Sequence, residues 1–292
     1  EPPSPTSTEV LVEVHAAGLN PVDYKTRSGS GVAAWAGPPP YVPGWDVAGV
    51  VVSSGYGVTR FAPGDRVFGM PRFPRAGSCY AEYVTAPSLQ LAKIPPALDF
   101  QQAAALPLAG LTTWQSLVDA AAVSPGQVVL VHGAAGGVGH IAVQIAAARG
   151  ATVIATARGE SHDFLRELGS FELVDRDAPV GQAGQDVDVV VDLVGGQDTS
   201  AALRTLRSGG VLLAIADGAD ETTRADAEYL GVRVLEPLVE PDGRGLESVV
   251  GLVAEGAVRV VVDSVFALEE AADAHRRLEE GGVRGKVVLT VR

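Results

Sequence analysis

The chain has 292 residues, 47% hydrophobic and 20% charged, and its 22 basic against 35 acidic side chains give a net charge of −13. A nucleic-acid surface needs clustered positive charge, so this balance argues against a nucleic-acid partner. The single cysteine, Cys79, excludes an internal disulfide and a Cys-rich zinc lobe, and a reducing cytoplasm suits it best. No apolar run approaches the roughly 20 residues of a membrane span, and no leader-like segment opens the chain, so no membrane location is expected.

The first hundred residues have the pattern of a β-rich region. Short Val-rich runs such as Val10–Val14, Trp45–Val52 and Tyr80–Thr85 are separated by Gly and Pro, without a clean 3.6-residue period. Strand-length runs with turn residues between them predict a compact antiparallel β region over residues 8–105.

From residue 109 onward, strand candidates alternate with helix-length segments. The strand candidates are short apolar runs at Gln127–His132, Thr152–Thr156, Val187–Asp192, Gly210–Ala216 and Val232–Leu235. The helix candidates lie between them at Gly139–Arg149, Asp163–Leu168 and Thr199–Leu206. Such alternation predicts βαβ units and a mostly parallel sheet.

Residues 237–292 follow a helix, strand, helix, strand pattern that is too short to fold alone. We expect them to join the N-terminal β region, so that residues 1–108 and 237–292 form one domain and residues 109–236 an inserted second domain. The cleft between two such lobes is the natural ligand site. The predicted fold class is α/β, with a β-rich catalytic domain and a doubly wound parallel-sheet domain.

The strongest local signal is the segment Val128–Gly139, VVLVHGAAGGVG, which runs from a strand candidate into a helix candidate. Glycines let a backbone turn sharply and approach a pyrophosphate, and a helix N-terminus presents unpaired N–H groups and a positive dipole end. The alternative is a tight turn that binds nothing, but the order strand, glycines, helix, strand favours a dinucleotide. We expect Gly133, Gly136, Gly137 and Val138 to bind it.

The end of the second strand indicates which dinucleotide binds. An NAD enzyme places an acidic residue there, about 20 residues after the glycines, to bond the ribose 2′-hydroxyl. Here the strand ends Thr156-Ala157-Arg158, and a guanidinium suits the additional phosphate of NADP. The alternatives are that Arg158 is simply solvated, or that Glu160 pairs with it or binds the ribose. We expect NADPH, with Thr156 and Arg158 among the residues that bind it.

Seven further segments accompany the glycine loop, in the order HAAGLNPVDYKTRSG, VPGWDVAGVV, PGDRVF, GSCYAEYV, LPLAGLTTWQSL, VDLVGG and HRRLEEGGVRGKVVLTV. Together they span nearly the whole chain and resemble the zinc-independent quinone oxidoreductase branch of the medium-chain dehydrogenase/reductase superfamily. The resemblance implies a GroES-like catalytic domain split in sequence around a Rossmann domain, NADPH in the cleft, a small-molecule acceptor and a homodimer. Relatives begin with an extra strand pair before the equivalent of Thr8, and these strands are apparently missing here.

Zinc-dependent members of that superfamily carry a Cys within the equivalent of Gly18–Asn20 and a His within that of Gly44–Asp46, and this chain has neither. Zinc needs thiolate sulfur or neutral imidazole nitrogen in a tetrahedral set, and the five histidines are scattered. Without a metal, hydride addition to a C=C conjugated with a carbonyl is easier than reduction of a simple ketone, because the charge spreads onto oxygen. We therefore expect a metal-free reductase of quinones or enones.

The resemblance also implies roles for individual residues. Asn20 resembles the residue beside the nicotinamide ribose and the substrate, and Tyr24 and Lys25 follow on the same loop as the available proton donors. The alternatives are a packing aromatic at Tyr24, a solvated lysine at Lys25, and a proton taken from water. Lys286, in the RGK segment, resembles a position near the cofactor, although a strand-edge lysine that discourages aggregation accounts for it equally well.

The remaining implied cofactor residues lie along the parallel-sheet region. Thr112 resembles a residue that contacts the cofactor, and Val194 and Ile215 lie at strand ends and are expected to flank the nicotinamide. Arg176 is expected beside Arg158 at the 2′-phosphate, unless it pairs with a neighbouring aspartate.

The aromatic residues of the first domain do not identify the class of molecule that accepts the hydride. Trp35, Tyr41 and Trp45 form either a platform for a flat acceptor or parts of the core and of an interface. Two other functions compete with quinone or enone reduction. One is an enoyl reductase acting on a carrier-bound or biosynthetic intermediate, and the other is a non-catalytic NADPH-binding protein.

Overall fold

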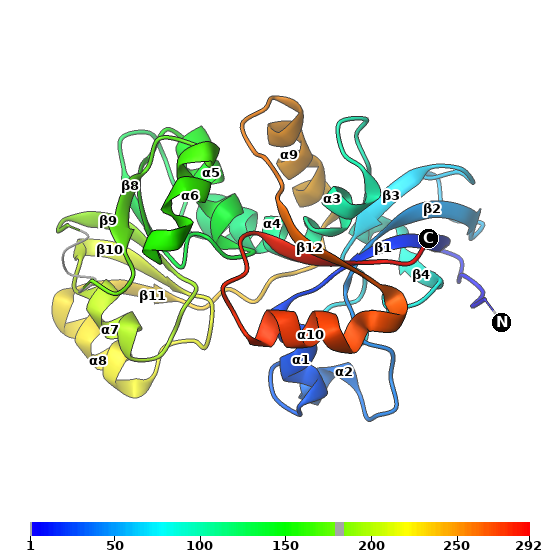
Figure 1. The fold of residues 1–292 in the computed structure, drawn as a ribbon, viewed down its shortest axis with the longest axis horizontal. Helices are drawn as coiled ribbons and strands as arrows, with labels where there is room; N and C mark the ends of the chain where they lie inside the picture. The colour runs from blue at the N-terminus through cyan, green and yellow to red at the C-terminus, as the bar shows by residue number, and fades with distance from the viewer. Residues whose placement is uncertain (1, 179–183) are drawn as a thin grey trace. The chain divides into compact units, whose positions relative to one another are not determined.

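The computed structural model describes residues 2–178 and 184–292. The chain divides into two compact units. Unit 1 contains residues 1–111, 240–255 and 260–292, drawn mainly in blue, cyan, orange and red in Figure 1, and unit 2 contains residues 112–239 and 256–259. Among the described residues, none of the helices has the length and apolar character that a bilayer crossing requires.

Unit 1 is built on a seven-stranded sheet. Its strands are β1 (Glu9–Gly18), β2 (Asp46–Ser54), β3 (Arg66–Gly69), β4 (Tyr83–Pro87), β5 (Leu91–Lys93), β12 (Val262–Ala267) and β13 (Lys286–Thr290). They run in the order β12-β13-β1-β2-β3-β5, while β4 also pairs with β1. All neighbours are antiparallel except β12 and β13, so the antiparallel β region predicted for the N-terminal residues is confirmed.

The first and last strands of the chain pair within this sheet. Ala17 on β1 lies opposite Leu289 on β13, so the C-terminal residues complete the sheet that the N-terminal residues begin. Alternate residues of β1 point into one apolar core, as expected for a strand with a period of two. The buried residues of that core are Val10, Val12, Val14, Val47, Val51, Phe61, Val67, Cys79, Val84, Ala86 and Leu91.

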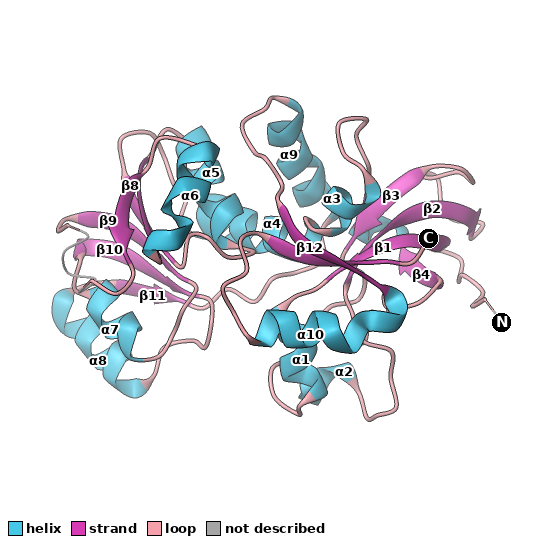
Figure 2. Cartoon of the chain, in the orientation of Figure 1, coloured by secondary structure: helices cyan, strands magenta, loops and turns pink. Residues whose placement is uncertain are grey.

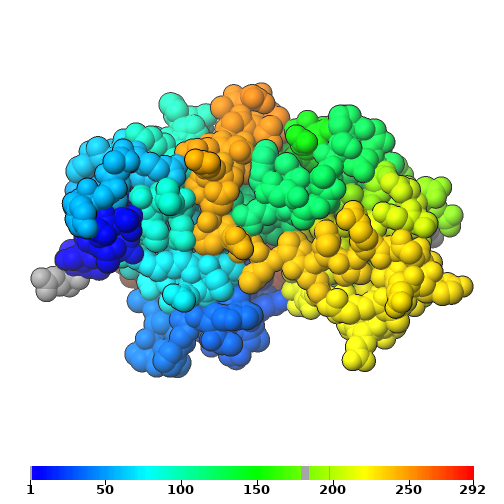
Figure 3. All heavy atoms as spheres, turned by 180° about the vertical axis from the view of Figure 1, so that it is seen from behind, coloured from blue at the N-terminus to red at the C-terminus, as the bar shows by residue number. Residues whose placement is uncertain are grey.

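Short helices connect and cover the strands of unit 1. They are α1 (Pro21–Arg27), α2 (Ala33–Ala36), α3 (Phe100–Ala104), α9 (Gly243–Ala254) and α10 (Ala271–Glu279), with 3-10 turns η1 (Ser88–Gln90) and η5 (Leu268–Glu270). Helix α9 packs closely on β5, because an added Cβ at Gly243 would meet the carbonyl oxygen of Leu91 at 2.4 Å. In Figure 3 the orange atoms of α9 lie against cyan atoms of this region.

Helix α1 occupies a segment that the sequence pattern represents as a loop. Asn20 is its N-cap, Pro21 is its first residue and Asp23 completes a capping box with Asn20. A proline at the first helical position and a reciprocal cap both favour a helix start. The candidate donors Tyr24 and Lys25 therefore lie on a helix rather than on a loop.

Unit 2 is a parallel α/β domain. Its strands are β6 (Val128–His132), β7 (Thr152–Ala157), β8 (Glu172–Asp175), β9 (Val187–Asp192), β10 (Leu206–Ala214) and β11 (Arg233–Leu235). Its helices are α5 (Gly139–Ala148), α6 (His162–Leu168), α7 (Gln197–Leu203) and α8 (Glu221–Leu230), with the 3-10 turn η3 (Gly159–Ser161). Helix α4 (Pro107–Trp114) leads into this unit and continues as a π-helical segment, η2 (Gln115–Ala120).

The six strands run in the order β11-β10-β9-β6-β7-β8, and every pair is parallel. Helices α5 and α6 cover one face of this sheet and α7 and α8 the other (Figure 2). The chain order reverses between β6 and β9, which is the topological switch point where ligands bind in doubly wound sheets. The predicted parallel sheet is confirmed.

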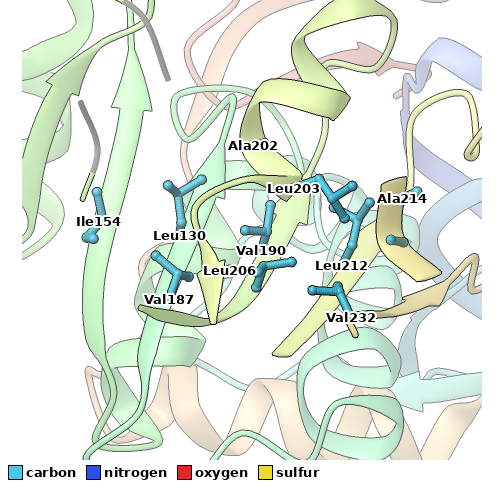
Figure 4. Packing of buried hydrophobic residues seen from close by; sticks show 11 residues of the cluster. Leu130, Ile154, Val187, Val190, Ala202, Leu203, Leu206, Leu212, Ala214 and Val232 are labelled. Carbon is cyan, nitrogen blue, oxygen red and sulfur yellow. The ribbon is translucent and has the colours of Figure 1, made fainter. Parts of the chain in front are cut away.

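The core of unit 2 lies between the sheet and helices α7 and α8. Figure 4 shows side chains of this core, among them residues of β6, β7, β9, β10 and α7. The buried members are Leu130, Ile154, Val187, Val190, Ala202, Leu203, Leu206, Leu212, Ala214, Ala227 and Val232. Such strands, apolar on both faces, are typical of a sheet covered on both sides.

Candidate functional site

The glycine loop between β6 and α5 uses its glycines for three different purposes. Gly133 has φ +87°, a left-handed conformation that glycine adopts without strain. An added Cβ at Gly139 would meet the carbonyl oxygen of Gly133 at 2.3 Å, so the start of α5 packs directly on the loop. An added Cβ at Gly136 would meet only that same oxygen, at 3.6 Å, so the backbone of Gly136 is open to a ligand.

Gly137 and Val138 lie directly before the first turn of α5, which begins at Gly139. The first N–H groups of a helix lack intrahelical acceptors, and the helix dipole places partial positive charge there. Helix α5 has no acidic residue in its first turn to use this charge. The loop and helix start therefore form a cradle suited to a pyrophosphate.

The side chains of His132 and Thr156 are hydrogen-bonded to each other, and Thr156 is also hydrogen-bonded to the glycine loop. The Oγ1 of Thr156 is hydrogen-bonded to His132 Nδ1 at 2.7 Å and accepts the backbone N–H of Gly133 at 3.3 Å. Both side chains are buried, and burial lowers the pKa of His132 so that its ring is neutral near pH 7. Thr156, expected to bind the cofactor, therefore contacts the glycine loop itself.

The end of β9 lies next to the glycine loop at the switch point. The Asp192 carboxylate accepts the backbone N–H groups of Val194 and Gly195 at 3.0 and 3.1 Å, and the Thr199 hydroxyl at 2.5 Å. The backbone N–H of Ile215 donates to the carbonyl oxygen of Asp192. Val194 and Ile215 are thus brought together with the glycine loop, since an added Cβ at Gly133 would meet Val194 Cγ2 at 3.1 Å.

Arg158 and Arg176 leave two neighbouring strands at the same edge of the sheet. Ala157 and Asp175 are register partners on β7 and β8, and the backbone N–H of Arg176 donates to the carbonyl oxygen of Ala157. Within residues 2–178 and 184–292, neither guanidinium forms an ion pair. The expected alternatives, pairing with Glu160 or with a neighbouring aspartate, are therefore not adopted.

Thr112 is buried near the C-terminal end of α4. Among the described residues, its side chain forms no hydrogen bond with the glycine loop. The structure thus brings together the predicted cofactor residues of the sheet edge, and Thr112 enters the site only through the resemblance.

In unit 1 a buried polar cluster surrounds Asn20. The side-chain nitrogen of Asn20 donates to Asp46 Oδ2 at 2.8 Å, and Lys286 Nζ donates to Asn20 Oδ1 and to the carbonyl oxygen of Leu19. Lys286 Nζ lies 3.6 Å from Asp46 Oδ2, and only 3% of the lysine side chain is exposed. Burial raises the pKa of Asp46 and lowers that of Lys286, while the attraction between the two charges opposes both shifts.

Asp23 and Tyr80 extend this cluster. Asp23 Oδ2 accepts the backbone N–H of Asn20 at 2.6 Å and the Tyr80 hydroxyl at 3.0 Å. Burial, reinforced by the neighbouring Asp46 carboxylate, raises the pKa of Asp23 to about 7. Burial also raises the pKa of Tyr80 well above its usual value, so its hydroxyl stays protonated and donates.

Asp23 is a site residue that the sequence analysis did not single out, and it accepts the backbone N–H of Asn20. The signal that identifies it is the capping-box spacing between Asn20 and a carboxylate three residues later. Tyr80 has no such local signal, because it reaches Asp23 from 57 residues away in sequence.

Two sequence-based alternatives are wrong. Lys286 is not an edge lysine, because β13 lies between β12 and β1 and the side chain is buried. The platform of three aromatic rings does not form, because Trp45 lies in the core, with its ring against Phe73 and its Nε1–H donating to the carbonyl oxygen of Arg75. Trp35 is 57% exposed.

Two family models match the chain, "Alcohol dehydrogenase GroES-like domain" over residues 6–96 and "Zinc-binding dehydrogenase" over residues 166–289. The chloroplast envelope quinone oxidoreductase homolog of Arabidopsis thaliana is 34% identical over 98% of this chain and 91% of its own length. These matches and the parallel sheet confirm the predicted fold class of a GroES-like domain with a Rossmann domain.

Solved structures agree over the whole chain. The quinone oxidoreductase from Coxiella burnetii has a TM-score of 0.92 at 38% identity and covers 100% of this chain and 93% of its own. An Escherichia coli quinone oxidoreductase complexed with NADPH has a TM-score of 0.85 at 28% identity, with coverage of 100% and 94%.

The residues present do not fit the zinc ion in the name of one family model. In the part of the chain that the structure describes, no three His, Cys, Asp or Glu side chains gather as a metal-binding group. At the two segments where zinc-dependent relatives carry ligands, Asn20 is bonded to Asp46 and Lys286, and Trp45 is buried. The Lys286 ammonium beside Asp46 would also repel a second cation.

Proposed function

Because the chain belongs to the quinone oxidoreductase branch of the medium-chain dehydrogenase/reductase superfamily, we propose that it is a metal-free, NADPH-dependent reductase of quinones or α,β-unsaturated carbonyls. The observation that carries this proposal is the sheet edge of unit 2. There an open glycine loop at the switch point lies on the same edge as the ends of β7 and β8, which are followed by two arginines that form no ion pair within the described residues.

Each part of that edge suits one part of the cofactor. The backbone of Gly136, Gly137 and Val138 with the start of α5 suits the pyrophosphate. Arg158 and Arg176 suit the 2′-phosphate, since two guanidiniums can each donate charge-assisted hydrogen bonds to it. We assign the nicotinamide side to Val194, Ile215 and Thr112 and, from unit 1, to Asn20.

Bound NADPH supplies a hydride from C4 of its nicotinamide. The acceptor gains this hydride at a carbon conjugated with a carbonyl, the negative charge passes to the carbonyl oxygen, and one proton completes the two-electron reduction. Such an acceptor needs no Lewis acid, because conjugation already stabilises the charge. The protein must orient the acceptor, donate hydrogen bonds to the developing oxyanion and exclude water.

The decisive experiment follows NADPH absorbance at 340 nm with three acceptor classes: a small benzoquinone, a simple enone and an acyl thioester with a conjugated double bond. We expect turnover with the quinone or the enone. Preference for the thioester makes the protein an enoyl reductase instead, and binding of NADPH without oxidation by any acceptor makes it a binding protein.

The cofactor preference gives a first prediction. Arg158→Ala and Arg176→Ala each remove charge-assisted hydrogen bonds of about 1.5–3 kcal/mol, so KM for NADPH rises roughly 10- to 100-fold. KM for NADH, which lacks the phosphate, stays unchanged. Arg166→Ala is the matched control, because Arg166 is an exposed arginine paired with Asp163. Tighter binding of NADH than NADPH by the unaltered protein overturns this assignment.

The proton donor gives a second prediction. Tyr24 and Lys25 on α1 are our candidates, and a positioned general acid contributes about 10²- to 10⁴-fold. We therefore expect one of the two substitutions, Tyr24→Phe or Lys25→Met, to lower kcat by about 100-fold while KM for NADPH stays unchanged. Unchanged turnover in both variants assigns the proton to water.

We also propose that the protein works as a cytoplasmic homodimer. The single cysteine, Cys79, is buried and reduced, which suits a reducing compartment. Light scattering at micromolar concentration tests the dimer, with a monomeric mass as the contrary result.

A further inference from the structure

The ammonium of Lys286 forms two hydrogen bonds and one ion pair inside unit 1. It donates to the carbonyl oxygen of Leu19 and to Asn20 Oδ1, and it lies 3.6 Å from Asp46 Oδ2. An ammonium has three donors and no acceptor. Because the Lys286 side chain is buried and its charge is paired with Asp46, its effect on a bound molecule is expected to pass through its partners.

The partner that matters is Asn20, whose amide is held from both ends. Its oxygen faces a group that only donates, Lys286, and its nitrogen faces a group that only accepts, Asp46. Turning the amide by 180° would place nitrogen against ammonium and oxygen against carboxylate. The two ionic groups therefore allow one orientation, in which the second hydrogen of the amide nitrogen has no acceptor within residues 2–178 and 184–292.

The same pair ties Asn20 to a second helix. Asp46 Oδ1 accepts the backbone N–H of Leu108, in the first turn of α4, at 2.9 Å. The backbone N–H of Asn20 donates to Asp23. The amide, the N-terminus of α1 and the start of α4 are thus fixed to one another by a few short contacts.

We propose that Lys286 and Asp46 are positioning residues that hold the Asn20 amide in the one orientation able to donate to the bound cofactor or acceptor. This inference rests on the proposed function, in which Asn20 contacts the nicotinamide side. In this proposal Lys286 does not contact the cofactor itself but acts on it through Asn20.

Stability alone is a weak reason for such a pair. Burying a lysine and an aspartate removes the hydration of each ion, and apolar replacements of buried ion pairs are often neutral or stabilising. Removal of one partner, by contrast, leaves an unpaired buried charge. A variant that removes both charges together therefore separates orientation from stability.

The experiment compares Lys286→Met with the double variant Lys286→Met/Asp46→Asn. The single variant is expected to lose stability in urea denaturation, because Asp46 is left unpaired. The double variant is expected to regain stability, yet its kcat stays at least 10-fold below that of the unaltered protein. Lys93→Met is the control, because Lys93 is an exposed lysine paired with Asp65, and it leaves kcat unchanged.

A readout independent of turnover accompanies the kinetics. In ¹⁵N NMR the side-chain NH2 of Asn20, assigned by its loss in Asn20→Leu, is expected to exchange slowly in the unaltered protein and fast in the double variant. Recovery of kcat together with stability in the double variant, or slow exchange retained there, overturns the positioning role.

Failure of the proposed function is distinguishable from failure of this inference. If none of the tested acceptors supports NADPH oxidation by the unaltered protein, the proposed function fails. The affinity for NADPH, measured by its fluorescence, then replaces kcat as the readout. An affinity at least 10-fold weaker in the double variant then supports the positioning role, and an unchanged affinity contradicts it.

Discussion

Asp23 has a buried carboxyl whose two oxygens differ. Oδ2 accepts two hydrogen bonds, from the backbone of Asn20 and from Tyr80, whereas Oδ1 has no partner among the described residues. A proton bound to Asp23 therefore belongs on Oδ1. Burial and the nearby Asp46 raise the pKa of this carboxyl to about 7, so it takes up that proton near neutral pH.

This pKa predicts a pH dependence of stability. Folded Asp23 binds its proton more tightly than the unfolded residue, so its contribution to the free energy of unfolding is present below about pH 4 and is lost as the pH rises to about 7. The slope is at most about 1.4 kcal/mol per pH unit. In urea denaturation, the advantage of the unaltered protein over Asp23→Asn should therefore shrink between pH 4.5 and 7 and stay constant above.

Asp65 is the matched control, because backbone and side-chain hydrogen bonds from Ala62 and Lys93 lower the pKa of its carboxyl. Its contribution to stability is present above the unfolded pKa and is lost as the pH falls. Asp65→Asn should show no shrinking advantage between pH 4.5 and 7. A constant difference for Asp23→Asn over that range contradicts the raised pKa.

Whether the role of a single residue could be predicted depended on how far apart in sequence its contact partners lie. Asn20 and Lys286 were found through motifs that resemble a family, but their mutual contact spans 266 positions and has no local signal. Asp23 is visible in a capping-box spacing, whereas the roles of Asp46 and Tyr80 depend on burial that only packing creates.

At the level of elements, the glycine loop joins β6 to α5. Replacement of two of its glycines is expected to have different effects, one on stability and the other on cofactor binding. Gly139→Ala places a methyl group 2.3 Å from a carbonyl oxygen, so it should cost about 1–3 kcal/mol of stability. Gly136→Ala meets nothing closer than 3.6 Å, so stability should be unchanged while the affinity for NADPH falls about 10-fold. Thermal unfolding and cofactor fluorescence measure the two effects.

Gly251→Ala on α9 is the control for both substitutions, because an added Cβ there meets nothing within 4 Å. It should leave cofactor affinity unchanged. Full affinity in Gly136→Ala would mean that the pyrophosphate does not approach this backbone.

Elements with strong β-branched or apolar runs were predictable, and short or polar ones were not. The strands β6, β7, β9 and β11 and helix α5 lie where the pattern places them, whereas β10 begins at Leu206, four residues before the predicted start. Strand β8 and helix α8 had no counterpart, because β8 has four residues and α8 is mostly polar, so neither produces a clear hydrophobic period. The short helices α1 and α3 begin instead at capping boxes.

For the molecule as a whole, the absence of a zinc ligand set among the described residues leads to one more prediction. Quinone-dependent NADPH oxidation should survive prolonged incubation with EDTA without loss of rate. Elemental analysis of the purified protein should find far less than one zinc per chain. Loss of activity with EDTA and its recovery with zinc would show that the metal-free assignment is wrong.

The alternation of strands and helices, the glycine loop and the arginine after the predicted strand at residues 152–156 could be predicted from the amino-acid sequence alone. These features depend on local spacing and on residue chemistry, which a single chain displays directly. The buried cluster of Asn20, Asp46, Tyr80 and Lys286, by contrast, exists only in the folded protein. Their charges and hydrogen bonds acquire their strength from the loss of water, and that loss occurs only when segments far apart in sequence pack together.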